Sequence, residues 1–238
     1  MQAWGGPVVG DGRPTLPFPT RSGVLGIVAA CMGILRHEND RLLALAEGTR
    51  VHIRVDAPGN PLVDDQTIQG HPEASATRQT IQSKRTYLCD ASFAAVVVPG
   101  PHSSVAAIAD AALAPTFAPF LGRRTCVLST PLLIAASVRG ANAVALFDHI
   151  ERGPREVLEQ LESSRWRGSN GDGDGSDDAP AAQDFYLDVD DYPGALRRIP
   201  IRDHLAGPLP RQWRERFAMH VRTHAKAAPS AAIPETRS

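Results

Sequence analysis

Three short groups of basic and hydroxyl side chains stand out as residues that could do chemistry. The first is Thr20-Arg21-Ser22, which follows a proline-rich approach from Arg13 and opens an apolar helix expected to run to Leu35. Prolines fix φ, so this approach is stiff. Because a helix start presents unpaired N–H groups, and Arg21 adds a full positive charge, the corner suits a phosphate. Thr20 or Ser22 can cap this helix. An ordinary capped core helix with a solvated arginine fits the same pattern.

The second group lies in a polar segment, residues 70–84, whose one large apolar residue is Ile81. Four polar or basic side chains alternate around it: Arg78, Thr80, Gln82 and Lys84. The pattern predicts an extended arm or hairpin that stands off the domain, and a flexible surface loop is the alternative. The strong strand expected over 85–98 anchors this arm in a sheet.

The third group is Gly122-Arg123-Arg124, between apolar flanks. A glycine lets the backbone approach a ligand closely, and two adjacent arginines can hold phosphates. An exposed basic turn is the alternative interpretation.

Charge is unevenly distributed along the 238 residues, although the net charge is only −1. Residues 148–191 hold thirteen of the 26 acidic residues but only four arginines, so the rest of the chain carries eight more basic than acidic residues. Such a balance suits a polyanionic partner. Codon bias offers another explanation, because all but two of the 25 basic residues are arginine.

The remaining pattern predicts alternating helices and strands. Helices are expected over 36–47, over 103–113 with Ser103 or Ser104 as cap, and over 143–161. Strands are expected over 50–55, through Cys126 and Val127, and over 185–189. His52, on the first of these strands, is expected to face solvent.

We expect a main folded domain over 1–140 and an irregular C-terminal extension over 141–238. The extension contains a disordered acidic loop at about 163–183 and then seven arginines within 197–222. Asp172, Asp174 and Asp178 loosely resemble a calcium loop, but its glycine and glutamate are out of register. We therefore predict no metal site and no cofactor.

Several classes of protein are disfavoured by the sequence. Three isolated cysteines are typical of buried thiols in a reducing cytoplasm, and the longest apolar run, Val24 to Leu35, is too short to span a bilayer. There is no P-loop, GxSxG, HExxH or zinc spacing. A metal-independent ribonuclease needs only a positioned acid, base and charge stabiliser, so His71, Lys84 and Tyr87 remain an enzymatic alternative.

Four stretches, in this order, carry a family resemblance: MQAWG, RPTLPFPTRSGVLGIVAACMGI, TIQSKRTYLCDASF and PFLGRRTC. They closely resemble the CasD family, the crRNA 5′-handle-binding subunits of type I-E CRISPR Cascade, within the repeat-associated RNA-binding superfamily. The resemblance covers about residues 1–133. It implies an α+β fold, a ferredoxin-like (RRM-type) domain with a protruding thumb hairpin at about 64–87.

The resemblance also implies a function: a non-catalytic, cytoplasmic scaffold for RNA in antiviral defence. Its partners would be the crRNA 5′ handle, the Cascade backbone subunits and large subunit, and indirectly target DNA, with no membrane. Another subunit would cut the precursor, although a relative in type I-C systems cuts it itself. A purely protein-binding adaptor is a third possibility.

Carried over residue by residue, the resemblance implies these RNA contacts: Arg21, Ser22, Thr80, Gln82, Lys84, Arg85, Tyr87, Gly122, Arg123 and Arg124. Basic side chains track phosphates, while arginine planes and aromatics stack on splayed bases. Arg85 is expected to stack or intercalate, and Arg21 and Arg123 to contact phosphates.

The sequence departs from the family in three respects. Asp64-Asp65-Gln66-Thr67 stands where the family often has an aspartate, aromatic and histidine step, and the thumb looks shortened. The family also has a strand before its Gln-Ala-Trp-Gly step. Because losing a central strand would be severely destabilising, we expect Met1 to be an internal methionine of a longer natural chain, or the chain to be truncated.

Overall fold

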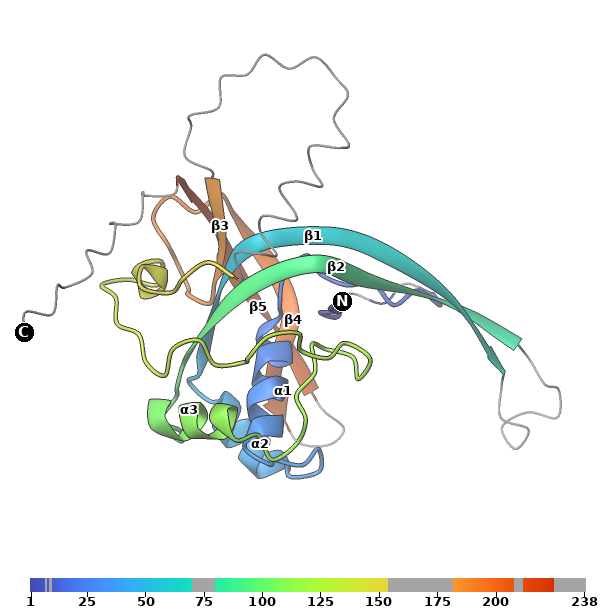
Figure 1. The fold of residues 1–238 in the computed structure, drawn as a ribbon, viewed down its shortest axis with the longest axis horizontal. Helices are drawn as coiled ribbons and strands as arrows, with labels where there is room; N and C mark the ends of the chain where they lie inside the picture. Colours follow the sequence, from blue (N-terminus) through green and yellow to red (C-terminus); the bar gives the residue numbers. More distant parts are fainter. Residues whose placement is uncertain (7, 9, 70–79, 154–181, 208–211, 225–238) are drawn as a thin grey trace, which may run out of the picture.

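The computed structural model describes residues 1–6, 8, 10–69, 80–153, 182–207 and 212–224. The helices are α1 (Arg21–Cys31), α2 (Asn39–Ala46), α3 (Val105–Leu113) and the short 3-10 helix η1 (Ala145–Phe147). The strands are β1 (Arg50–Gln69), β2 (Thr80–Val98), β3 (Ala182–Leu187), β4 (Arg197–Gly207) and β5 (Gln212–His224). They form one antiparallel sheet in the order β2-β1-β3-β5-β4, with the helices beside it (Figure 1). The α+β class is confirmed, and the ferredoxin-like arrangement stays a prediction.

Helix α1 begins where the sequence predicts. The Thr20 hydroxyl accepts a hydrogen bond from the Gly23 N–H at 3.1 Å, so Thr20 rather than Ser22 is the cap. The apolar face of α1 packs in a core that also contains Ile53 of β1 and Ile201 of β4. The helix is therefore fixed to the sheet, and its first turn has a defined position.

The other predicted helices and strands match the structure to different degrees. Helices α2 and α3 match the predictions, and Ser104 caps α3. The strand predicted through Cys126 is only an isolated bridge between Phe120 and Val127. Of the helix predicted over 143–161, η1 is the helical part within 143–153, and residues 154–161 lie outside the described part of the chain.

Strands β1 and β2 form a long curved hairpin that reaches away from the helices (Figure 1). Pairing continues to Gln69 and Thr80, well beyond the strand predicted to end at Val55. The described parts of the predicted thumb, 64–69 and 80–87, belong to this ladder, whereas 70–79 lie outside the described residues. The polar residues of this segment stay in strand conformation because backbone hydrogen bonds between β1 and β2 pair them.

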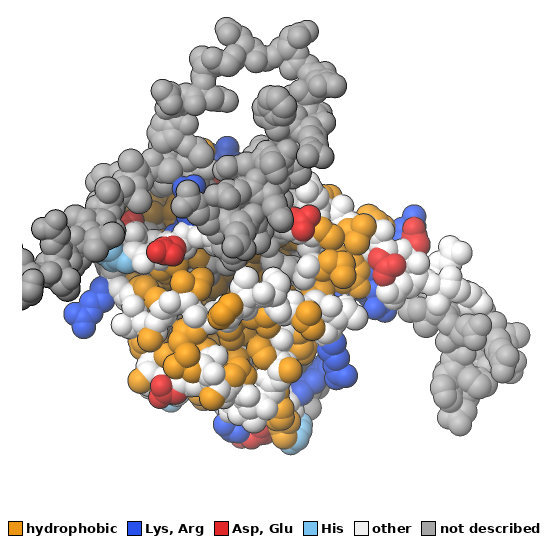
Figure 2. Space-filling view, in the orientation of Figure 1, with side chains coloured by type: hydrophobic (Ala, Val, Ile, Leu, Met, Phe, Trp, Pro, Cys, Tyr) orange, Lys and Arg blue, Asp and Glu red, His pale blue; other side chains and the backbone are white. Residues whose placement is uncertain are grey.

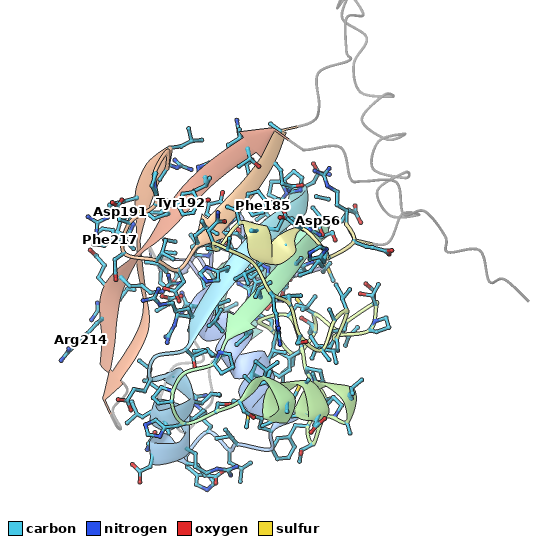
Figure 3. All side chains as sticks on the ribbon, turned by 90° about the vertical axis from the view of Figure 1, so that its left-hand side faces the viewer. Asp56, Phe185, Asp191, Tyr192, Arg214 and Phe217 are labelled. Carbon is cyan, nitrogen blue, oxygen red and sulfur yellow. The ribbon has the colours of Figure 1, made fainter. Side chains whose placement is uncertain are left out.

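An irregular C-terminal extension was the wrong prediction for the described residues, because β3, β4 and β5 join the sheet. Phe185 on β3 faces one core and Tyr186 faces the other, so both faces are buried and the simple polar-apolar alternation of a surface strand is lost. Figure 3 labels Phe185 on β3 and, on the adjacent strand β5, Arg214 and Phe217. Most of the predicted acidic loop lies outside the described residues, but Ala182 and Gln183 open β3.

The described surface mixes charge with apolar area. Figure 2 shows apolar side chains gathered over the helices in the lower half of the view. Large apolar residues that stay exposed include Leu113, Phe117, Val127 and Ile134. In the described ranges, no helix has the length and apolarity to cross a membrane, and no three His, Cys, Asp or Glu residues are grouped to hold a metal ion. The three cysteines are free thiols.

Candidate nucleic-acid interface

The N-terminal segment lies along the edge of β2. Gln2 and Leu88 exchange two backbone hydrogen bonds of 2.8 Å. Farther along, the Arg13 N–H donates to the Lys84 carbonyl at 2.7 Å, and the Thr86 N–H donates to the Arg13 carbonyl at 3.1 Å. Because both attachments are on a short stretch of β2, the chain between Gln2 and Arg13 must loop away from the strand.

The loop around Gly122 packs against the N-terminal segment. The Ala3 N–H donates to the Leu121 carbonyl at 3.0 Å, which holds this loop against the N-terminal segment. Gly122 has φ +87°, and a Cβ there would lie 1.7 Å from the Ala3 carbonyl oxygen. Glycine is therefore required for contact with Ala3. Close approach to a ligand, the predicted reason for this glycine, is not needed to explain it.

Between these segments lies a pocket of about 400 Å³. Its lining comprises Ala3, Gly5, Gly6, Val8, Arg13, Pro14, Arg85, Gly122 and Arg123. Three arginines thus meet beside glycine backbone and small apolar walls, without a carboxylate in the lining. Such a site attracts an anion and also offers apolar contact.

The predicted arginines differ in how they are held. Arg123 donates to the Thr86 carbonyl at 3.2 Å and to the Arg13 carbonyl at 2.8 Å, and its Cζ lies 4.5 Å from the centre of the Tyr87 ring. In the described part of the chain, nothing hydrogen-bonds or ion-pairs with the side chains of Arg85 or Arg124, and Arg124 is exposed. Arg85 is therefore free to bind an anion at the pocket.

The predicted hairpin contacts divide between two faces. Since successive side chains alternate in a strand, Arg85 and Tyr87 point to one face and Thr80, Gln82 and Lys84 to the other. Lys84 is 73% exposed and lies 3.9 Å from Asp65, whereas Tyr87 is only 6% exposed. The structure therefore does not bring Lys84 and Tyr87 together as an acid and base, and His71 lies outside the described residues.

A direct phosphate contact by Arg21 is a prediction that the structure contradicts. Arg21 is 4% exposed, donates to the carbonyls of Thr49 and Ala46, and lies 3.3 Å from Asp188. Burial lowers the pKa of Arg21, and Asp188 opposes that shift.

The Ser22 N–H at this helix start already donates to Asp203 at 3.3 Å. The positive helix end is therefore satisfied by a carboxylate of the protein. An RNA contact by the Ser22 side chain stays a prediction.

His52 also departs from expectation, because it is buried at 3% exposure rather than facing solvent. Its Nδ1 accepts a hydrogen bond from the Asp188 N–H at 3.2 Å. Burial lowers the pKa of His52 to about 4, so the ring is neutral at neutral pH. The strand agrees with the prediction, but the burial of its polar face depends on residues far along the chain, since Arg54 on that face donates to the carbonyls of Phe147 and Ile150.

Sequence reasoning missed part of the pocket. Arg13, Gly5 and Gly6 line it but were not nominated. The available signals were the Gly5-Gly6 step and an arginine directly before Pro14. Neither signal points to Arg85 and Arg123, which reach the same place from distant parts of the chain.

Comparison with known proteins identifies the family of this chain. The model of the CRISPR-associated protein family (Cas_Cas5) matches residues 1–198. The chain belongs to the Cas5 family. The predicted resemblance to CasD is confirmed as well: the Escherichia coli (strain K12) protein "CRISPR system Cascade subunit CasD" is 40% identical over 147 residues. That match covers 56% of this family member and 66%, just under two thirds, of the E. coli chain.

Solved structures resemble this Cas5 family member over nearly its whole length. A chain of a "CRISPR RNA-guided surveillance complex" matches with a TM-score of 0.64 at 29% identity, covering 95% of this chain and 87% of that one. A "Crystal structure of Cas protein" matches with a TM-score of 0.50 at 26% identity, covering 92% and 90%. The mixed helical and antiparallel architecture is therefore one that Cas proteins adopt.

Proposed function

We propose that this chain binds the 5′ handle of a CRISPR RNA as a non-catalytic subunit of a Cascade-type surveillance complex. The observation that carries the proposal is the pocket at the base of the β1–β2 hairpin, where Arg13, Arg85 and Arg123 meet. Single-stranded RNA is held by basic side chains along its phosphates and by planar groups against its bases. The pocket offers both kinds of group.

The hairpin extends this proposed interface. Thr80, Gln82 and Lys84 lie on the face of β2 opposite Arg85, so RNA that passes the pocket could also contact the arm from its other side. Asp65 beside Lys84 reduces the positive charge there. We therefore assign the stronger phosphate attraction to the pocket and a weaker, orienting role to the arm.

Partner subunits are part of the same proposal. Leu113, Val127 and Ile134 are exposed although they are large and apolar. Residues 125–138 contain no charged side chain, which is unfavourable for an RNA contact but suitable for a protein contact. We assign this surface to a backbone or large subunit, and target DNA would be reached only through the assembled complex.

The non-catalytic role rests on the separation of the candidate acid and base groups. Lys84 points into solvent on one face of the hairpin, while Tyr87 is buried beneath Arg123 on the other. General acid–base catalysis requires both groups within reach of one reacting phosphate. The proposed role of the chain is therefore to hold RNA, with cleavage left to another subunit.

One incubation tests both parts of the proposal. The purified full chain is mixed, without metal ions, with labelled single-stranded repeat RNA, and the products are resolved on native and denaturing gels. We expect RNA of reduced mobility on the native gel and intact RNA on the denaturing gel. Failure to retard the RNA would overturn the binding role, and a discrete cleavage product would overturn the non-catalytic role.

A further inference from the structure

Arg123 is fixed by the protein before any RNA arrives. Its two terminal nitrogens donate to the carbonyls of Thr86 and Arg13, and its Cζ lies 4.5 Å from the centre of the Tyr87 ring. These two bonds occupy two of the five N–H donors of the guanidinium. Together with the Tyr87 ring they fix the plane of the guanidinium, so its flat surface has a set orientation.

Arg123 contacts the Tyr87 ring and also lines the pocket. Tyr87 is buried and does not line the pocket, whereas Arg123 does. One face of the guanidinium is thus covered by the Tyr87 ring, and the same residue borders the pocket. Guanidinium groups stack on aromatic rings through both faces, and they stack on unpaired bases in RNA complexes.

The rest of the pocket suits a nucleotide rather than a lone phosphate. Ala3, Val8 and Pro14 supply apolar walls, which contribute nothing to phosphate binding but favour a base. Arg85 is also in the lining, and its side chain makes no hydrogen bond or ion pair with the described residues. Base and phosphate contacts are thus available side by side.

We propose that the pocket takes one splayed base of the RNA, stacked on Arg123 above Tyr87, while Arg85 holds an adjacent phosphate. This inference rests on the RNA-binding role proposed above. It exchanges the roles predicted from the sequence, in which Arg85 stacks and Arg123 binds phosphate. Arg123 becomes a determinant of which handle position is extruded, and Tyr87 is the support that keeps its guanidinium in place.

The test is an abasic scan of the repeat RNA with the full-length protein. Each handle nucleotide in turn is replaced by an abasic one, and the dissociation constant is measured at fixed salt. We expect one position to lose affinity by about 5- to 150-fold, the range that base stacking gives. Losses below about twofold at every position would overturn the inference.

Arg123→Lys identifies the stacking partner, because lysine keeps the charge but lacks the planar group. We expect the abasic penalty at that position to fall below about twofold, with the salt dependence of binding unchanged. A penalty that persists in Arg123→Lys would overturn the inference while leaving the proposed function intact. Absence of RNA binding by the wild-type protein would instead overturn the proposed function. Thermal unfolding of the variant confirms that it is folded.

Discussion

Arginines of this chain have three different roles that their sequence context does not separate. Arg21 is buried among backbone carbonyls, Arg123 is fixed over an aromatic ring, and Arg85 is free of described partners. The cap of α1 could be narrowed to Thr20 or Ser22 from the sequence, because capping depends on neighbours within three residues. The partners of Arg21 are 25 to 167 residues away, so no local pattern predicts its burial.

The first prediction concerns Arg21→Ala. Removing this guanidinium leaves Asp188 with Arg216 alone as its cation and takes the Arg21 donors from the buried carbonyls of Ala46 and Thr49, so the free energy of unfolding should fall by about 2–5 kcal/mol. The measurement is urea unfolding. Arg41→Ala is the control, because Arg41 is exposed on α2 and pairs only with nearby Glu38 in the described structure; it should change stability by less than about 0.5 kcal/mol. Equal effects of the two substitutions would contradict the structural role of Arg21.

At the scale of the element, the curved β1–β2 hairpin sets the geometry of the proposed interface. The flanking pairs Pro58–Ala91 and Asn60–Cys89 place Gly59 opposite Asp90, and these two residues have φ of +68° and +55°. Strands 50–55 and 85–98 could be predicted from their β-branched and apolar residues. The continuation through Asp64 and Asp65 could not, since only the backbone ladder favours strand there.

The second prediction compares two glycines. Gly59→Ala should lower the free energy of unfolding by at least about 1–2 kcal/mol, because alanine disfavours positive φ and its Cβ would lie 2.5 Å from the Cys89 carbonyl oxygen. Gly26→Ala should raise it by about 0.5–1 kcal/mol, since Gly26 is exposed in α1 with open space around it. Urea unfolding of both variants measures the difference. A Gly59→Ala variant at least as stable as the wild-type chain would mean that the hairpin does not depend on this conformation.

At the scale of the whole molecule, distant parts of the chain are joined by one polar network. Arg216 of β5 lies 2.6 Å from Asp203 and 3.4 Å from Asp188, and these carboxylates also contact the start of α1. The sequence showed a run of arginines in this region but not their acidic partners. Sequence reasoning therefore predicted the fold class and most N-terminal elements, but not the strands and ion pairs that depend on closure of the sheet.

The pocket has the same dependence on tertiary structure. Its arginines were individually visible in the sequence, yet they converge only because Gln2 and Arg13 both pair with β2 and the Gly122 loop packs on Ala3. The family resemblance nominated Arg85 and Arg123, while Arg13 came from the fold. The pocket is thus the place where the sequence and the structure together support an RNA-binding role.

The most direct test of that role is the salt dependence of RNA binding by Arg85→Ala. Affinity of the wild-type chain, Arg85→Ala and Arg139→Ala for single-stranded repeat RNA is measured across a salt series. Arg139 is an exposed arginine outside the pocket lining and serves as the matched control. We predict weaker binding by Arg85→Ala and a slope of log K against log salt that is shallower by about 0.7, as loss of one phosphate contact requires. A slope for Arg85→Ala equal to those of the wild type and Arg139→Ala would contradict RNA binding at this pocket.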